Sequence, residues 1–154
     1  MSPEPEILVE EPAWASVSPN DLVARCVAAT SNETADMGLT RIVTALFTTD
    51  AVVQALNTEW REKNKPTNVL SFPAEPLPGL PTEVQPLGDL AFAYETCARE
   101  AEDKGISLKD HATHLIVHGV LHLLGYDHAR EDEAEAMEAL EIKILARLGI
   151  NNPY

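Results

Sequence analysis

His118-Gly-Val-Leu-His122-Leu-Leu-Gly125-Tyr-Asp-His128 is the stretch around which the rest of this sequence is organised. Residues four apart lie on one face of an α-helix, about 6 Å apart along its axis, so His118 and His122 can present two imidazoles to one metal ion. Gly125 can adopt the left-handed conformation that ends a helix, which would bring His128 back as a third ligand. Three nitrogen ligands leave the fourth position of zinc open to water, as in catalytic sites.

The glycine and the third histidine distinguish this pattern from a pair of packed core histidines. Two histidines four apart on an apolar helix are common without a metal, whereas the full H-x-x-x-H-x-x-G-x-x-H frame resembles zinc-binding motifs. Gly119 stands where the metalloprotease motif H-E-x-x-H carries its general-base glutamate. The sequence therefore predicts a zincin-like metal site and argues against proteolysis.

The composition is that of a globular protein with an acidic surface. The 154 residues, 45% of them hydrophobic, suffice for one domain spanning 1–154, with a frayed segment at 1–6. The formal net charge of −14 disfavours non-specific binding of nucleic acid over the whole surface, although a local basic cleft remains compatible with it.

The sequence also favours a cytoplasmic location. It contains no apolar run long enough to span a membrane, and its first residues lack the basic and apolar regions of a signal peptide. Cys26 and Cys97 form no C-x-x-C pair, so we expect reduced, half-buried thiols rather than a disulfide or a metal site.

Hydrophobic periodicity predicts a small mixed sheet with helices packed on it, an α+β fold. The expected strands are 7–9, 39–48, 69–72 and 87–93. The expected helices are 18–32, one that Asp50 caps, 95–103, one that begins at a Ser107 cap and carries the histidines, and 131–148. The five prolines between 73 and 86 exclude a helix or central strand there, leaving a lid over the site or a solvated connection.

The helix with the histidines is apolar almost all round, which predicts that it is buried and gives its ligands a rigid mount. The acidic first half of the last helix, from Glu131 to Glu138, suits a solvated helix N-terminus. We expect His111 to be exposed. His114, one turn before His118, is expected to support the site from behind the ligands or to be packed.

Three ordered blocks of this sequence resemble the YbeY family of bacterial rRNA maturation factors, which are metal-dependent endoribonucleases. The first is the stretch His118–His128, and the second combines Leu56-Asn-x-x-Trp-Arg61 with Lys65-Pro-Thr-Asn-Val-Leu-Ser-Phe-Pro73. The third is Leu87-Gly-Asp89, and together the blocks span nearly the whole chain.

The resemblance implies one zinc ion held by His118, His122 and His128, and an α+β fold with a four-stranded sheet and about five helices. It implies action on single-stranded RNA in 16S rRNA 3′-end maturation and ribosome quality control, with Arg61 and His118 associated with function. Two departures concern only local packing: Trp60 replaces a usual tyrosine, and Leu90-Ala-Phe replaces a more β-branched segment.

Arg61 and its neighbours supply the expected phosphate contacts. A guanidinium matches two phosphate oxygens, so Arg61 is a candidate catalytic residue, although it could instead pair with an adjacent glutamate on the surface. Lys63 and Lys65 make the same loop locally basic, which predicts an entry point for an RNA backbone; an ordinary solvated loop is the alternative.

Each of four further polar residues has two possible roles. Asn68 and Ser71 are candidates for RNA contact, or they satisfy the loop backbone. Asp89 and Asp127 are candidates for orienting a ligand histidine, or they cap turns. No residue stands out as a general base, so the nucleophile is either a water activated by zinc alone or the RNA 2′-hydroxyl.

The leading hypothesis is a zinc-dependent endoribonuclease that acts on rRNA precursors and has the ribosome or its proteins as partners, with neither membrane nor DNA expected. One alternative is a ribosome-assembly factor that binds RNA and whose metal is structural. The other is a metallohydrolase of another small substrate. The sequence alone leaves all three open.

Overall fold

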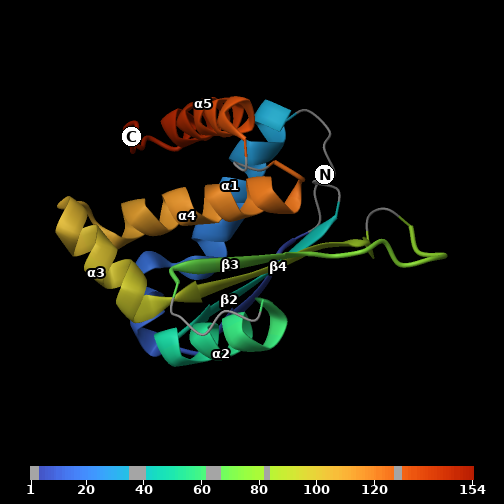
Figure 1. Cartoon of the computed structure of the whole chain (residues 1–154), viewed down its shortest axis with the longest axis horizontal. Helices are drawn as coiled ribbons and strands as arrows, with labels where there is room; N and C mark the ends of the chain where they lie inside the picture. The colour runs from blue at the N-terminus through green and yellow to red at the C-terminus, as the bar shows by residue number, and fades with distance from the viewer. Residues whose placement is uncertain (1–3, 35–40, 62–66, 82–83, 127–129) are drawn as a thin grey trace.

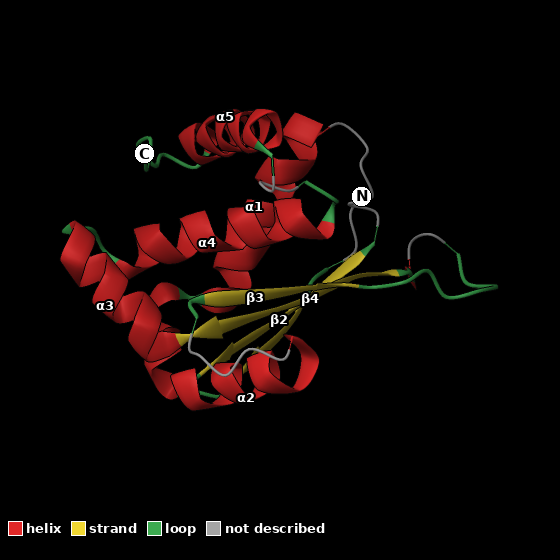
Figure 2. Ribbon diagram, viewed as in Figure 1, coloured by secondary structure: helices red, strands yellow, loops and turns green. Residues whose placement is uncertain are grey.

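The structure is a computed structural model of the whole chain, and it describes residues 4–34, 41–61, 67–81, 84–126 and 130–154. Within these ranges the strands lie in the first two thirds of the chain and three consecutive helices follow them, which together build an α+β fold (Figure 2). None of the helices described is both long and apolar enough to cross a membrane. In chain order the elements are β1 (Glu6–Val9), the 3-10 helix η1 (Pro12–Val17), α1 (Pro19–Thr34), β2 (Ile42–Thr48), α2 (Asp50–Arg61), β3 (Val69–Pro73), β4 (Pro86–Ala93), α3 (Tyr94–Lys104), α4 (Leu108–Leu123) and α5 (Glu131–Arg147).

The four strands form one mixed sheet in the order β1-β2-β4-β3, which confirms the predicted fold class. β1 pairs with β2 and β2 with β4 in parallel, whereas β3 runs antiparallel to β4. Parallel neighbours need a crossover connection, and α1 provides it between β1 and β2. The prolines at 73 and 86 end β3 and begin β4, positions that tolerate a missing backbone donor.

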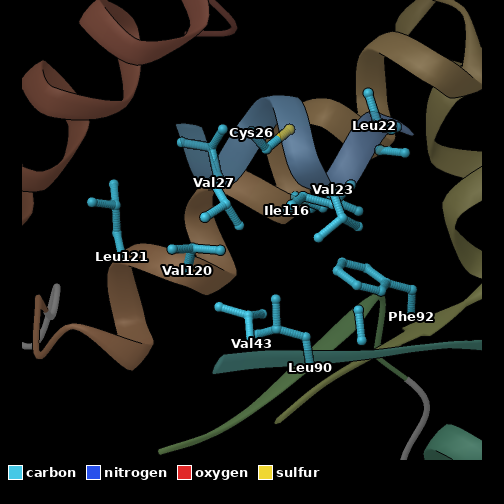
Figure 3. Packing of buried hydrophobic residues seen from close by; sticks show 14 of the residues in the cluster. Leu22, Val23, Cys26, Val27, Val43, Leu90, Phe92, Ile116, Val120 and Leu121 are labelled. Carbon is cyan, nitrogen blue, oxygen red and sulfur yellow. The ribbon is translucent and has the colours of Figure 1, made fainter. Parts of the chain in front are cut away.

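The two faces of the sheet are covered differently. α2 packs on one face, while α4 crosses the other with α1 and α5 beyond it, and α3 lies at the end of the sheet (Figure 1). Apolar side chains of α1, α4, β2 and β4 fill the larger layer (Figure 3). At one end of this core Phe47 stacks on Phe92 with ring centroids 4.8 Å apart. The Trp14 and Phe47 rings form a T-shaped pair with their centroids 5.2 Å apart.

The helix α4 begins and ends as the sequence predicts. The Ser107 hydroxyl accepts a hydrogen bond from the Asp110 amide at 3.0 Å, which caps the first turn. At the other end Gly125 has φ +101°, and the Tyr126 and Gly125 amides donate to the Leu121 and His122 carbonyls, each at 3.0 Å. This left-handed glycine terminates α4 just after the second histidine of the motif.

Two local predictions need correction. The helix α2 is capped by Thr49, whose hydroxyl accepts from the Val52 amide at 3.3 Å. The expected cap, Asp50, instead accepts from the backbone amide and hydroxyl of Thr96 at 2.9 and 2.7 Å, because α3 starts beside it. Both cysteines are free and fully buried rather than half-buried.

The glycine at 119 allows α4 to lie close to the sheet. A Cβ atom on Gly119 would meet Leu90 Cδ2 at 2.8 Å, and Leu90 is itself only 1% exposed. Since a closely packed leucine has little room to move, a side chain at position 119 requires a shift of the helix. Metalloproteases carry their catalytic glutamate at this position. In this protein the position is a glycine, which allows α4 to pack against β4.

Replacing Gly119 by alanine is expected to destabilise the protein by about 1–2 kcal/mol, because the cost of overpacking exceeds the gain in helix propensity. Urea unfolding of the wild type and the variant measures this difference. Adding Leu90→Val, which removes the clashing methyl group, should recover part of the loss. If the changes in unfolding free energy of the two single variants simply add in the double variant, Leu90 is not the source of the strain.

Candidate functional site

A cleft of about 1030 Å³ runs along α4, between this helix, β3, α3 and the C-terminal segment. Four histidines at successive turns of α4 lie along it: His111, His114, His118 and His122. His118 and His122 occupy one end of the cleft, and His111 the other. The periodicity of the helix therefore places all four side chains in one cavity.

The pair His118 and His122 has the geometry of two ligands to one ion. Their Nε2 atoms are 3.0 Å apart, and the ring centroids are 4.5 Å apart. Two nitrogens bound to tetrahedral zinc at about 2.0–2.1 Å would lie roughly 3.3 Å from each other. The two imidazoles thus fit a shared ion with only a small adjustment.

Glu141 of α5 fixes the orientation of His118. Its side chain is 1% exposed, and Oε1 lies 2.6 Å from His118 Nδ1. A carboxylate only accepts hydrogen bonds, so His118 Nδ1 carries a proton, and in the neutral ring Nε2 is then the unprotonated nitrogen that can ligate a metal. Such a carboxylate behind a histidine ligand is the usual way in which proteins set the tautomer of a metal site.

The other oxygen of Glu141 is held by two further donors. His114 Nε2 lies 2.9 Å from Oε2, and the Tyr154 hydroxyl donates to the same oxygen. Burial alone would raise the pKa of Glu141, yet hydrogen bonds from the two histidines and Tyr154 lower this pKa to about 2. Burial and the neighbouring Glu141 carboxylate raise the pKa of Tyr154, which keeps its hydroxyl protonated. Glu141 is therefore a buried anion with both oxygens occupied.

A second polar cluster lies at the far end of the cleft. His111 Nε2 is 2.8 Å from Glu100 Oε1, and the side-chain amide of Asn68 donates to the same oxygen at 2.9 Å. His111 is 2% exposed, which corrects the expectation that it faces solvent; docking of α3 against α4 covers it. Burial lowers the pKa of His111 and outweighs the opposite effect of Glu100.

Among the described residues, no group of three or more histidine, cysteine, aspartate and glutamate side chains is arranged to hold a metal ion. The third predicted ligand, His128, and its neighbour Asp127 lie outside the described ranges.

Comparison with known proteins identifies the family. The sequence profile of Endoribonuclease YbeY matches residues 14–149. The chain belongs to the endoribonuclease YbeY family. An Endoribonuclease YbeY from Erythrobacter litoralis is 64% identical over 115 residues, which cover 71% of each chain. One from Ruegeria pomeroyi is 47% identical over 164 residues, covering 97% of this chain and 96% of the relative.

A solved structure shares the fold. The solution structure of TM1509 from Thermotoga maritima aligns with a TM-score of 0.58 and covers 94% of this chain and 91% of its own. Its sequence identity of 18% limits the conclusion to the architecture. Family membership confirms the resemblance seen in the three sequence blocks, and the α+β architecture agrees with it.

Other residues predicted for the site are spread over two cavities of this YbeY-family fold. Asn68 and Ser71, the candidates for RNA contact, both line the cleft. Asn68 also serves its local backbone, since its side-chain oxygen accepts from the Val69 amide at 2.7 Å. Arg61 is the last residue of α2; its side chain is not described, and Lys63 and Lys65 lie outside the described ranges.

Asp89 does not support His118 or His122. Side chains alternate along a strand, and the neighbouring Leu90 faces α4 through its contact with the Gly119 position. Asp89 therefore points to the α2 face, where it lines a separate cavity of about 430 Å³ with Trp60. Burial and the nearby Glu6 raise the pKa of its carboxyl group. Asp89 therefore does not have the predicted role of orienting a histidine for His118 or His122, the two predicted ligands within the described residues.

The segment between β3 and β4 projects away from the helices (Figure 1). Its described part is closed on itself by Gln85, whose side chain exchanges hydrogen bonds with the backbone of Leu77 at 2.7 Å in both directions. Of residues 73–81 and 84–86, only Pro73 lines the cleft. This arrangement is that of an exposed connection and not of a closed lid.

Glu141 is one of three site residues that the sequence analysis missed, together with Glu100 and Tyr154. The acidic residues singled out on the last helix end at Glu138, which is exposed. Glu141 instead falls on the buried stripe of α5, four residues after Met137 and three before Ile144. A glutamate within an apolar helical stripe is rarely buried without a partner. Its place in that stripe could therefore have indicated a buried carboxylate with a polar partner.

Proposed function

We propose that this chain is a zinc-dependent endoribonuclease that cleaves single-stranded RNA in the cleft along α4. His118, His122 and His128 would hold the ion. The observation that carries the proposal is the 3.0 Å approach of the His118 and His122 Nε2 atoms, with His118 oriented by the buried Glu141. The activity itself is the one named for its YbeY relatives.

The zinc ion and the side chains around it would have different roles in phosphodiester cleavage. A bound zinc ion would supply charge stabilisation and activation of a water or phosphate oxygen. Glu141 holds His118 in the metal-binding tautomer, and the His114 and Tyr154 contacts keep Glu141 in place. Arg61 would bind the phosphate oxygens and stabilise the charge that develops on them.

The position of Arg61 supports this role. Arg61 follows Asn57 by four residues in α2, and Asn57 lines the same cleft as the histidines. Residues four apart share a helix face, so position 61 lies on the same face of α2 as Asn57. Lys63 and Lys65 follow directly in the sequence and would guide the RNA backbone in this acidic protein.

The biological substrate we propose is a precursor of 16S rRNA, processed at its 3′ end in the cytoplasm, with the ribosome or its proteins as partners. The basis for this assignment is the resemblance to the YbeY family, together with a cleft large enough for more than one nucleotide. We propose that residues 1–154 act as a single domain, in which the cleft along α4 binds the RNA.

Replacing Arg61 by alanine is expected to lower the rate of single-stranded RNA cleavage by about 10²–10³-fold, because one donor to the developing charge is lost. Zinc content should stay at the wild-type level. Initial rates on a labelled RNA, normalised to bound zinc, measure the effect.

Arg25→Ala provides the matched control, since Arg25 is exposed on α1 and does not line the cleft. It removes the same charge and should leave the rate unchanged. Equal activity of the wild type, the Arg61 variant and a zinc-free preparation would indicate a contaminating nuclease. That result would favour a binding role in ribosome assembly instead.

A further inference from the structure

The carboxylate of Glu100 is presented in the cleft at some distance from the histidine pair. It is on α3 and faces His111 of α4, which lies seven residues before His118 and thus about 10 Å along the helix axis. Glu100 is 34% exposed, so it is accessible from the cleft.

Two neighbours hold this carboxylate through one of its oxygens. His111 Nε2 and the Asn68 amide both contact Oε1, at 2.8 and 2.9 Å. His111 Nδ1 is buried and has no hydrogen-bond partner among the described residues, so the ring proton resides on Nε2 and is donated to Glu100. Within the same residues, nothing hydrogen-bonds to Oε2.

An oriented carboxylate has a restricted choice of partners on RNA. It repels phosphate groups, and it accepts hydrogen bonds but cannot donate them. The groups on RNA that can satisfy it are the amino and imino N–H groups on the base edges and the ribose hydroxyls. Since unpaired bases in single-stranded RNA expose their Watson–Crick edges, a rigid acceptor beside the strand can read an amino group.

We infer that Asn68, Glu100 and His111 form a nucleobase subsite, in which Glu100 Oε2 accepts a hydrogen bond from the exocyclic amino group of a base flanking the cleaved bond. Cytosine fits this subsite better than uracil. Uracil carries an acceptor oxygen where cytosine carries its amino group, and its one base-edge donor, N3–H, lies between two carbonyl oxygens that repel the carboxylate. The inference rests on the proposed RNA-cleaving function for the placement of the strand.

The test compares two hexanucleotides, 2′-O-methyl oligocytidylate and oligouridylate, binding to the full-length protein loaded with zinc. Fluorescence anisotropy gives the dissociation constants, and a gel verifies that the oligonucleotides stay intact. We expect the wild type to bind the cytidylate about tenfold more tightly, within the range that one base contact supplies.

Glu100→Gln should abolish or reverse this preference. The glutamine oxygen can still accept from His111 and Asn68, but its amide then offers a donor, which suits uracil. Asp103→Asn is the matched control, since Asp103 is exposed on the same wall of the cleft and its replacement removes the same charge. That variant should keep the preference for cytidylate.

The outcomes separate this inference from the nuclease proposal. If unmodified RNA is cleaved but the wild type shows no preference, or Glu100→Gln and Asp103→Asn behave alike, the subsite is refuted and the nuclease stands. If RNA is not cleaved but the preference depends on Glu100, the subsite stands without the nuclease. Should Glu100→Gln fail to fold, the wild-type NMR signals of the Asn68 amide decide: they should shift with cytidylate and not with uridylate, and equal shifts refute the subsite.

Discussion

Replacing His122 by alanine is expected to remove the bound zinc and to lower the rate of RNA cleavage by more than roughly 100-fold. A loss of roughly 100-fold is what removal of a residue that only hydrogen-bonds to a metal ligand causes, and His122 is expected to bind the metal itself. His122 contributes one of the two nitrogens that meet at 3.0 Å. His122 is preferable to His118 for this test, because His118 also carries a hydrogen bond to the buried Glu141. The fold should persist, since the buried side chains of α4 remain, among them Ile116, Val120 and Leu121.

Metal analysis, circular dichroism and cleavage rates on the same preparation provide the readouts. Lys109→Ala is a suitable control, because Lys109 is exposed on the same helix and does not line the cleft. A folded His122 variant that retains one zinc ion and wild-type cleavage would show that this residue is not a ligand.

Replacing Glu141 by glutamine is expected to weaken zinc binding by about 10–100-fold, because the carboxylate that sets the tautomer of His118 is lost. The glutamine amide occupies the same space but can accept through only one atom. The glutamine NH2 group is a donor, so at least one of the donors now provided by His118, His114 and Tyr154 would lie against another donor. Competition with a chromophoric chelator measures the dissociation constant of zinc.

The control is Glu138→Gln, three residues earlier on the exposed face of α5. It removes the same charge from the same helix and should leave zinc affinity unchanged. The stability of the metal-free protein must be measured alongside, because a buried polar group with an unsuitable partner also destabilises the fold by about 1–3 kcal/mol. Unchanged zinc affinity in a folded Glu141 variant would rule out the orienting role.

Features governed by neighbouring residues were predictable from the sequence. The Ser107 cap and the Gly125 terminus of α4 follow from local rules for helix ends, and the structure reproduces both. The alternation of strand and helix patterns gave the mixed sheet. The spacing of four between His118 and His122 placed two nitrogens together without any knowledge of the tertiary structure.

Contacts between distant segments were not predictable in this way. Glu141 reaches His118 across 23 residues of sequence, and only the packing of α5 on α4 brings them together. His111 is buried because α3 docks beside it. The orientation of Asp89 depends on which face of the sheet α4 covers, and the alternation within a strand does not specify that choice.

The central claim is that zinc held by the motif histidines is required for RNA cleavage. The most direct measurement is a titration of the metal-free wild-type protein with zinc, in which bound metal and cleavage of a single-stranded RNA are followed together. The proposed function predicts that activity rises in proportion to bound zinc and saturates at one ion per chain, while the His122→Ala protein stays inactive throughout. Cleavage that is independent of bound zinc, or equal in the two proteins, would contradict it.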